Sequence, residues 1–226
     1  MSEDMIRVDE LRNQSIAEMN LIEQLTDIID TIEKASQRLG DMLQALRDEK
    51  YELVKKGYEF VRMVKENAQS KKEQAMEYLV RISPNLMYKE IFMLTLNHLD
   101  TLAQSVDELG FKVALAAKLR IKCSSLPDVT NMYNTITEML SLLRQESKNL
   151  SINPKLSLEQ HTKIVSLEDK IDNNYRKLDE TIMGKTSEMA LSEALVLKDV
   201  IDLIEGAADK IRETSYGLKY IALHRF

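Results

Sequence analysis

Apolar residues recur along the chain at steps of three, four and seven. In the first segment these positions are Ile22, Leu25, Ile29, Ile32, Leu39, Leu43 and Leu46, with charged residues between them. This spacing places the apolar side chains on one face of an α-helix. The pattern predicts a long amphipathic helix over residues 8–46, in which Gly40 is a weak point because glycine inside a helix costs about 1 kcal/mol relative to alanine.

The same spacing continues in five further segments. They are predicted over 50–82, 88–121 and 128–148, with two more in 157–226 that join near Gly184. Ser83–Pro84, Pro127 and Asn153–Pro154 separate these segments, because proline pushes the preceding residue out of helical geometry. We therefore expect all three prolines between helices and expect Asp128 to cap the fourth helix.

The order of these segments predicts an all-α protein. Only six glycines and three prolines interrupt a chain rich in strong helix formers. Three helices, a break at Pro127 and three more helices predict two tandem three-helix bundles, over residues 1–126 and 127–226. The repeat lies in this arrangement rather than in matching residues, and the fourth helix is predicted to be shorter than the first.

Composition restricts the classes of function. The 226 residues are 44% hydrophobic and 30% charged, with a formal net charge of −6, which favours a folded protein and argues against nucleic acid as a partner. Cys123 is the only cysteine, so a disulfide or thiolate zinc site within the chain is excluded. The sequence contains neither a secretory signal nor a membrane-spanning run, and we expect a cytoplasmic protein.

The two last helices each carry acids four residues apart. Glu168 and Asp172 lie in LEDKID, and Glu205 and Asp209 lie in LIEGAAD. Residues four apart project to the same side of a helix, where like charges repel by a few tenths of a kcal/mol. A cation that compensates four converging acids is one interpretation, and solvated faces of ordinary amphipathic helices are the other.

The run Leu167–Leu223, with LEDKID and LKDVIDLIEGAADKI, resembles the second half of PhoU-like proteins. In particular, it is similar to the divergent branch associated with low-affinity, Pit-type phosphate transporters. In that family an E(D)-x-x-x-D motif on paired helices binds metal ions, commonly iron or zinc. The resemblance implies the same plan of two three-helix bundles and a metal site at Glu168, Asp172, Glu205 and Asp209.

Other acids are additional candidates for that metal site. Asp179 and Asp202 lie on the same flanks as the paired acids, whereas Asp100 and Asp107 are seven residues apart and lack a partner four residues away. The first half therefore departs from the family pattern. Iron, zinc, manganese and magnesium are all candidates for the ion, and carboxylate ligands alone suit magnesium, calcium, manganese or iron.

No constellation in the sequence predicts an enzyme. None of His98, His161 and His224 follows a glutamate by three residues, as the di-iron bundles require. A glycine-rich phosphate loop, a G-x-S-x-G motif and a Cys–His pair at a known spacing are missing as well. We interpret the histidines as surface or packing residues and the twelve methionines as core filler.

Two hypotheses of different classes follow. The resemblance implies a non-enzymatic regulator of phosphate uptake or phosphate signalling that docks onto a phosphate transporter or its associated signalling protein, with metal ions held by the paired carboxylates. Such a protein would reach the membrane only through its partner. The alternative is a structural helical scaffold or coiled-coil interaction protein without a metal site, for example a homo-oligomer formed through the long first helix.

Overall fold

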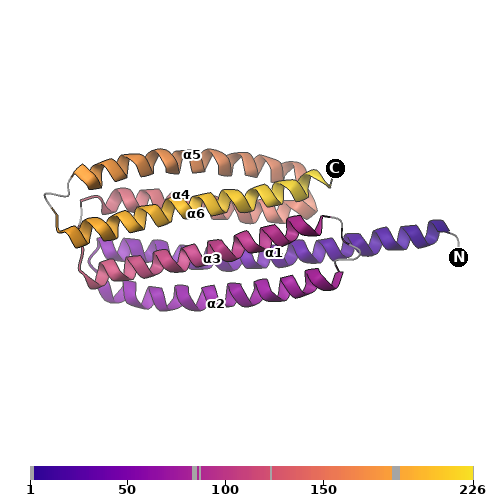
Figure 1. Ribbon diagram of the computed structural model, residues 1–226, viewed down its shortest axis with the longest axis horizontal. Coiled ribbons are helices and arrows are strands. Elements are labelled where there is room, and N and C mark those ends of the chain that lie inside the picture. Colours follow the sequence, from indigo (N-terminus) through magenta and orange to yellow (C-terminus); the bar gives the residue numbers. More distant parts are fainter. Residues whose placement is uncertain (1–2, 83–85, 87, 123, 185–188, 226) are drawn as a thin grey trace.

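The computed structural model is a bundle of six long helices that run along one common axis (Figure 1). It describes the backbone of residues 3–82, 86, 88–122, 124–184 and 189–225, and the side chains of these residues from Ile16 onward. No strand occurs in these ranges. The helices are α1 (Glu3–Arg47), α2 (Tyr51–Ile82), α3 (Lys89–Lys118), α4 (Leu126–Ile152), α5 (Pro154–Gly184) and α6 (Leu191–Leu223). The all-α prediction is confirmed.

The helices group into two bundles of three. The helices α1, α2 and α3 pack against one another, as do α4, α5 and α6. Between the bundles, α1 packs on α4 and α3 packs on α6, so helices at equivalent positions of the two halves meet. That pairing is the one that a twofold relation between the halves produces, and it confirms the predicted arrangement. The first part of α1 extends beyond the other helices (Figure 1).

Two of the prolines lie inside helices, so the prediction that all three would lie between helices is wrong. Pro127 lies in the first turn of α4, and Pro154 is the first residue of α5. Proline is tolerated there because an N–H in the first turn has no partner within the helix. Asp128 lies in the first turn of α4 and Ser125 holds the N-cap position, which corrects the predicted cap. Pro84 falls outside the described residues.

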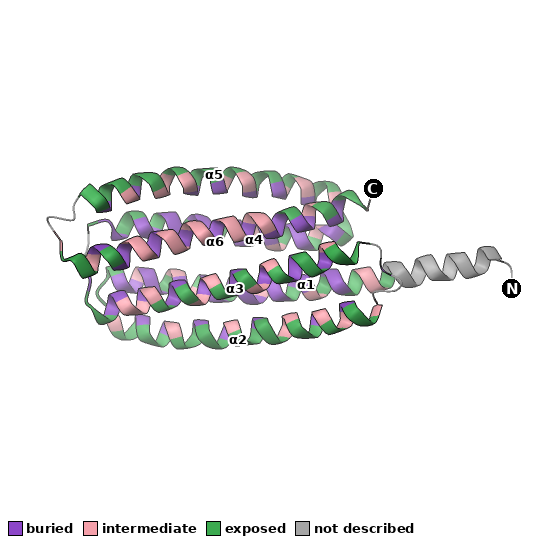
Figure 2. Ribbon diagram, viewed as in Figure 1, coloured by how far each residue is buried: buried purple, intermediate pink, exposed green. Residues whose placement is uncertain are grey.

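One apolar core runs through both bundles. Buried residues form stripes along the inner faces of the helices, whereas α2 and α5 are exposed on their outer faces (Figure 2). Polar contacts cross this core between α1 and α4. The Ser36 and Tyr133 hydroxyls lie 2.7 Å apart, and those of Thr26 and Ser147 lie 2.5 Å apart. Buried polar groups with partners fix the register of packed helices.

Gly217 sets the distance between α3 and α6. A Cβ atom at this position would collide with the Oγ1 of Thr95 and lie 3.2 Å from the Cβ of Thr95. Thr95 is fully buried and its hydroxyl donates to the carbonyl of Ile91 at 2.7 Å, so it cannot move aside without loss of that bond. The missing side chain of Gly217 is therefore what allows the two bundles to approach along α3 and α6.

This close approach predicts opposite effects for two glycine substitutions in α6. Gly217→Ala should lower the free energy of unfolding by about 1–3 kcal/mol, because an added methyl group overpacks the contact with Thr95. Gly206→Ala should raise it by up to about 1 kcal/mol, because open space surrounds Gly206 and alanine is the better helix former. Urea denaturation of both variants measures the difference. Equal stability of the two variants would contradict the assigned role of Gly217.

Candidate functional site

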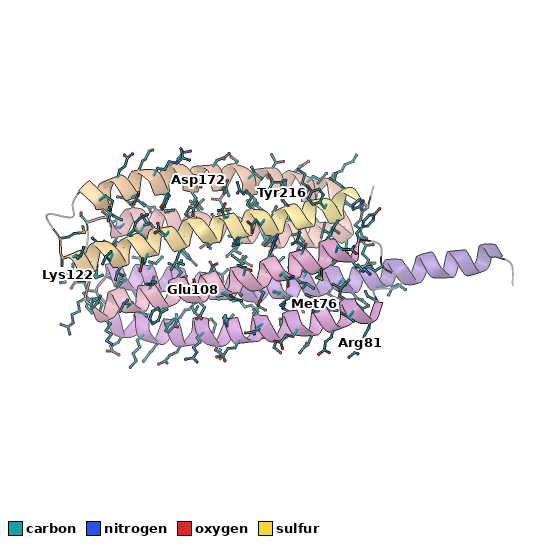
Figure 3. The ribbon with its side chains drawn as sticks, in the orientation of Figure 1. Met76, Arg81, Glu108, Lys122, Asp172 and Tyr216 are labelled. Atoms are coloured by element: carbon teal, nitrogen blue, oxygen red, sulfur yellow. The ribbon has the colours of Figure 1, made fainter. Side chains whose placement is uncertain are left out.

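The predicted acids of α5 and α6 lie in one electrostatic neighbourhood. We call Glu168, Asp172, Asp179, Asp202, Glu205 and Asp209 the acidic seam; Figure 3 labels Asp172 on α5. Glu168 is only 3% exposed, so the interpretation as a solvated face fails for this residue. Burial raises the pKa of Glu168, Arg212 opposes that shift, and the charges of Asp172 and Asp209 add to it. The two helices therefore bring acids together as the resemblance implies.

Glu205 shows the same crowding from the side of α6. Burial raises its pKa, and the charges of Asp209, Asp172 and Asp202 raise it further, whereas Arg212 lowers it. Within the described residues, neither Asp172 nor Glu205 is joined to a basic side chain by an ion pair. This pair carries the negative charge that the seam leaves uncompensated.

Arg212 of α6 joins the two helices across the seam. Its Nη1 lies 2.9 Å from the Oε1 of Glu168 on α5, and its Nη2 lies 2.9 Å from the Oδ1 of Asp209 on its own helix. Each end of the guanidinium fork thus contacts a different carboxylate. The contact with Asp209 is a charge-assisted hydrogen bond, and the contact with Glu168 is an ion pair; hydrogen bonds to ionised groups are about twice as strong as neutral ones.

Lys198 makes a second cationic crossing about four turns nearer the start of α6. Its Nζ lies 2.6 Å from Asp202, 3.1 Å from Asp179 on α5, and 2.7 Å from the Tyr175 hydroxyl, and it also lies over the ring of Tyr175 at 4.8 Å. Burial lowers the pKa of Lys198, but the bonds to Asp202, Tyr175 and Asp179 outweigh it and give a net rise. Lys198 therefore compensates the charges of Asp179 and Asp202, the two additional candidate metal ligands in the seam.

As the side chains lie, the acidic seam does not fit a metal ion. No group of three or more His, Cys, Asp or Glu side chains converges in a way that could hold one within the described part of the chain. Arg212 takes up an oxygen of Glu168 and one of Asp209, where a metal with mainly carboxylate ligands would need them. The metal site stays a prediction from the resemblance.

Of the two candidate acids of the first bundle, Asp107 shares a hollow with Asp202 of the seam. Asp100 pairs with Lys72 of α2 at 3.6 Å and accepts a bond from Gln104 at 3.2 Å. Asp107 lies about two turns further along α3, its Oδ1 is buried without a hydrogen-bond partner, and the hollow that it lines with Asp202 has a volume of about 510 Å³. The two carboxylates serve different contacts.

A buried polar cluster in the second bundle escaped the sequence analysis. Ser215 of α6 donates to the Oε2 of Glu146 at 2.6 Å, and its hydroxyl lies 2.8 Å from the Nδ1 of His161. Burial raises the pKa of Glu146 well above 4.5, partly opposed by Ser215 and by the charge of Lys219. Burial also lowers the pKa of His161 to about 4, and Lys219 lowers it further. Both shifts favour the uncharged forms of Glu146 and His161 in the folded protein.

This cluster is not a nucleophilic site. Ser215 and Glu146 are fully buried and His161 is 5% exposed, so a substrate cannot reach the hydroxyl. The order of contacts also differs from a catalytic triad, because serine rather than histidine is in the middle. The cluster links α4, α5 and α6 as part of the core, in agreement with the interpretation of His161 as a packing residue.

A sequence signal for these missed residues did exist. Glu146 follows Leu143 by three residues and so falls on the apolar stripe of α4, where an acid is out of place. Arg212 follows Asp209 by three residues and Lys198 precedes Asp202 by four, spacings at which opposite charges meet on a helix. The spacing could not show that both cations also reach α5.

A groove lies between the start of α2 and the end of α3, and we call it the Tyr58 groove. It has a volume of about 980 Å³. Its lining includes Lys50, Tyr51, Leu53, Lys55, Tyr58, Phe111, Leu115, Lys118 and Arg120. Leu53 and Phe111 are each 51% exposed, and the Tyr58 and Phe111 rings are tilted with centroids 6.1 Å apart. Lys122, labelled in Figure 3, marks this end of the molecule.

Solved structures show what this arrangement of helices resembles. A putative PhoU-like phosphate regulatory protein from Shewanella oneidensis MR-1 matches with a TM-score of 0.75 and 13% identity over 91% of this chain and 100% of that one. PhoU from Pseudomonas aeruginosa matches with a TM-score of 0.77 and 13% identity over 93% and 99% of the two chains. The chain has the PhoU-like fold.

A third PhoU-like structure agrees at lower similarity. The phosphate transport system regulatory protein PhoU from Streptococcus pneumoniae gives a TM-score of 0.63 and 16% identity over 91% of this chain and 96% of that one. No protein-family model matches this sequence, and no curated protein sequence matches it either. The PhoU-like fold is therefore established from structure, and the low-affinity branch stays a prediction.

The buried cluster predicts a pH-dependent effect of Glu146→Gln. The folded protein keeps the proton on Glu146 where the unfolded chain has released it. Its stabilisation is therefore complete below the ordinary pKa of 4.5 and is lost as pH rises through the folded value. Glutamine stays neutral, so the variant should gain stability relative to wild type as pH rises above about 5, by at most about 1.4 kcal/mol per pH unit.

Urea denaturation at several pH values measures this difference. Neutralisation of His161 affects wild type and variant alike, so it cancels. Glu138→Gln is the matched control, because Glu138 is exposed on the same helix, and it should follow wild type throughout. A difference between Glu146→Gln and wild type that does not change with pH would show that Glu146 is ionised in the folded protein.

Proposed function

We propose that this protein is a non-enzymatic, PhoU-like regulator that restrains phosphate uptake or phosphate signalling by docking onto a protein of a phosphate transport system. The observation that carries the proposal is the fold, which this chain shares over nine tenths of its length with three proteins described as PhoU or PhoU-like phosphate regulators. Fold alone does not fix function, so the features of the surface must support the proposal independently.

A docking function needs a surface on which a partner can bury apolar area, and the Tyr58 groove provides one. Its aromatic walls are held in place, because the ring of Tyr58 packs over Gly110, where a Cβ would lie 3.2 Å from that ring. Exposed Leu53 and Phe111 would lose contact with water on binding. Aromatic residues in concave sites are typical centres of protein interfaces.

The charge around the groove indicates the chemistry of the partner. Lys50, Lys55, Lys118 and Arg120 line it, against Glu49 and Glu52, and Glu49 is engaged by Lys122 at 2.6 Å. A basic rim in a chain with a net charge of −6 is complementary to an acidic segment. We assign the groove to an amphipathic helix of the transport-system partner, with its apolar face in the groove and acidic residues at its flank.

Two further observations are consistent with a regulator that is peripheral to the membrane and not an enzyme. No helix within the described ranges is long and apolar enough to cross a bilayer. Ser215, which contacts His161, is sealed from solvent. The proposal does not depend on a bound metal, because the acidic seam as it stands does not fit one.

Deletion of the gene tests the proposed function. Cells of the source organism without this protein should take up labelled phosphate faster than wild-type cells in phosphate-rich medium, because the restraint on the transport system is gone. A copy of the wild-type gene should restore the lower rate. Unchanged uptake in the deletion strain would contradict the proposal and favour a structural scaffold.

The same assay tests the docking surface. The double variant Lys55→Glu and Lys118→Glu reverses two charges of the basic rim and should fail to restore the lower uptake rate. The double variant Lys155→Glu and Lys163→Glu makes the same change in net charge on exposed positions of α5 and should restore it. Equal behaviour of the two variants at equal expression would show that the Tyr58 groove is not the docking surface.

A further inference from the structure

The acidic seam holds its own positive charges at defined positions. Arg212 bridges Glu168 of α5 and Asp209 of α6 with 2.9 Å contacts from separate ends of its guanidinium. Lys198 bridges Asp179 of α5 and Asp202 of α6. Four of the six acids thus already have a cationic partner on the opposite helix or the same one, and both cations come from α6.

Arg212 contacts the most buried acid of the seam, Glu168. The side chain of Glu168 is only 4% exposed, and an unpaired carboxylate there would carry a large desolvation cost. Arg212 meets that carboxylate and Asp209 at the same time, so its guanidinium lies among the four acids that the E-x-x-x-D motifs supply. A metal ion bound by those four acids would have to displace it.

The acids of the seam that pair with neither Arg212 nor Lys198 make a poor metal site. Asp172 and Glu205 remain, and two carboxylates provide too few ligands for iron or zinc, which need three or more protein ligands in a stable site. Magnesium can bind through one or two carboxylates and water, but only weakly without further ligands such as phosphate groups.

We propose that Arg212 takes the place of a metal ion in this protein, so that the α5–α6 seam is closed by a guanidinium of the chain itself and needs no metal to be ordered. Removal of the guanidinium frees the oxygens of Glu168 and Asp209 beside Asp172 and Glu205. We expect these carboxylates to close around a hard divalent cation such as Mn²⁺ once the guanidinium is gone, because their charges are then uncompensated. The inference concerns the seam alone, and its outcome leaves the proposed function standing.

The experiment compares wild type, Arg212→Ala and Arg212→Lys after exhaustive treatment with chelator. Bound Mn²⁺ is counted from the loss of the free-ion signal in electron paramagnetic resonance, and thermal melts are recorded with and without Mn²⁺. Arg176→Ala is the matched control, because it removes an exposed arginine of α5 and changes net charge equally without opening the seam.

Wild type, Arg212→Lys and Arg176→Ala should bind no Mn²⁺ stoichiometrically, and their melting temperatures should not respond to it. Arg212→Ala should bind about one ion and melt roughly 5–10 °C higher at a hundred times its dissociation constant. Should Arg212→Ala fail to fold without metal, recovery of its fold by Mn²⁺ supports the proposal, and failure to recover contradicts it. Stoichiometric binding by wild type, or no gain of binding by the variant, would overturn it.

Discussion

Carboxylates that face each other across two packed helices repel unless positive charge lies between them, and this constraint governs the second bundle. Arg212 supplies this charge near the middle of α5 and α6, where it contacts Glu168 and Asp209. Lys198 supplies it nearer one end, where it contacts Asp179 and Asp202. Because both cations belong to α6, that helix carries the means of holding α5 in place. The packing of α6 against α3, where Gly217 meets Thr95, then ties the charged seam to the rest of the molecule.

This arrangement separates what the fold requires from what the docking function requires. The acidic seam lies in the second bundle, whereas the Tyr58 groove lies in the first, between α2 and α3. The groove depends on Gly110, because a Cβ atom there would crowd the ring of Tyr58. It also depends on the basic residues at the start of α2 and the end of α3. A regulator built in this way can keep its second bundle ordered by internal ion pairs and present its docking surface on the first.

The sequence predicted the six helices and their grouping because apolar periodicity over segments this long leaves little choice of structure. It misplaced Pro127 and Pro154, since proline stops a helix that precedes it but suits the first turn of one that follows. It also identified the acids that meet between α5 and α6. It did not reveal that Arg212 joins them or that Glu146, Ser215 and His161 form a buried cluster, because both features depend on the rotation of one helix relative to another.

The central claim is that Arg212 and Glu168 stabilise each other across the seam without any metal. A double-mutant cycle with Arg212→Met and Glu168→Gln, measured by urea denaturation in the presence of chelator, tests it directly. We predict a coupling free energy of about 1 kcal/mol or more, with solvent at the partly exposed arginine limiting its size. Effects of the two substitutions that add to within about 0.3 kcal/mol would show that the pair is not coupled and would contradict the account.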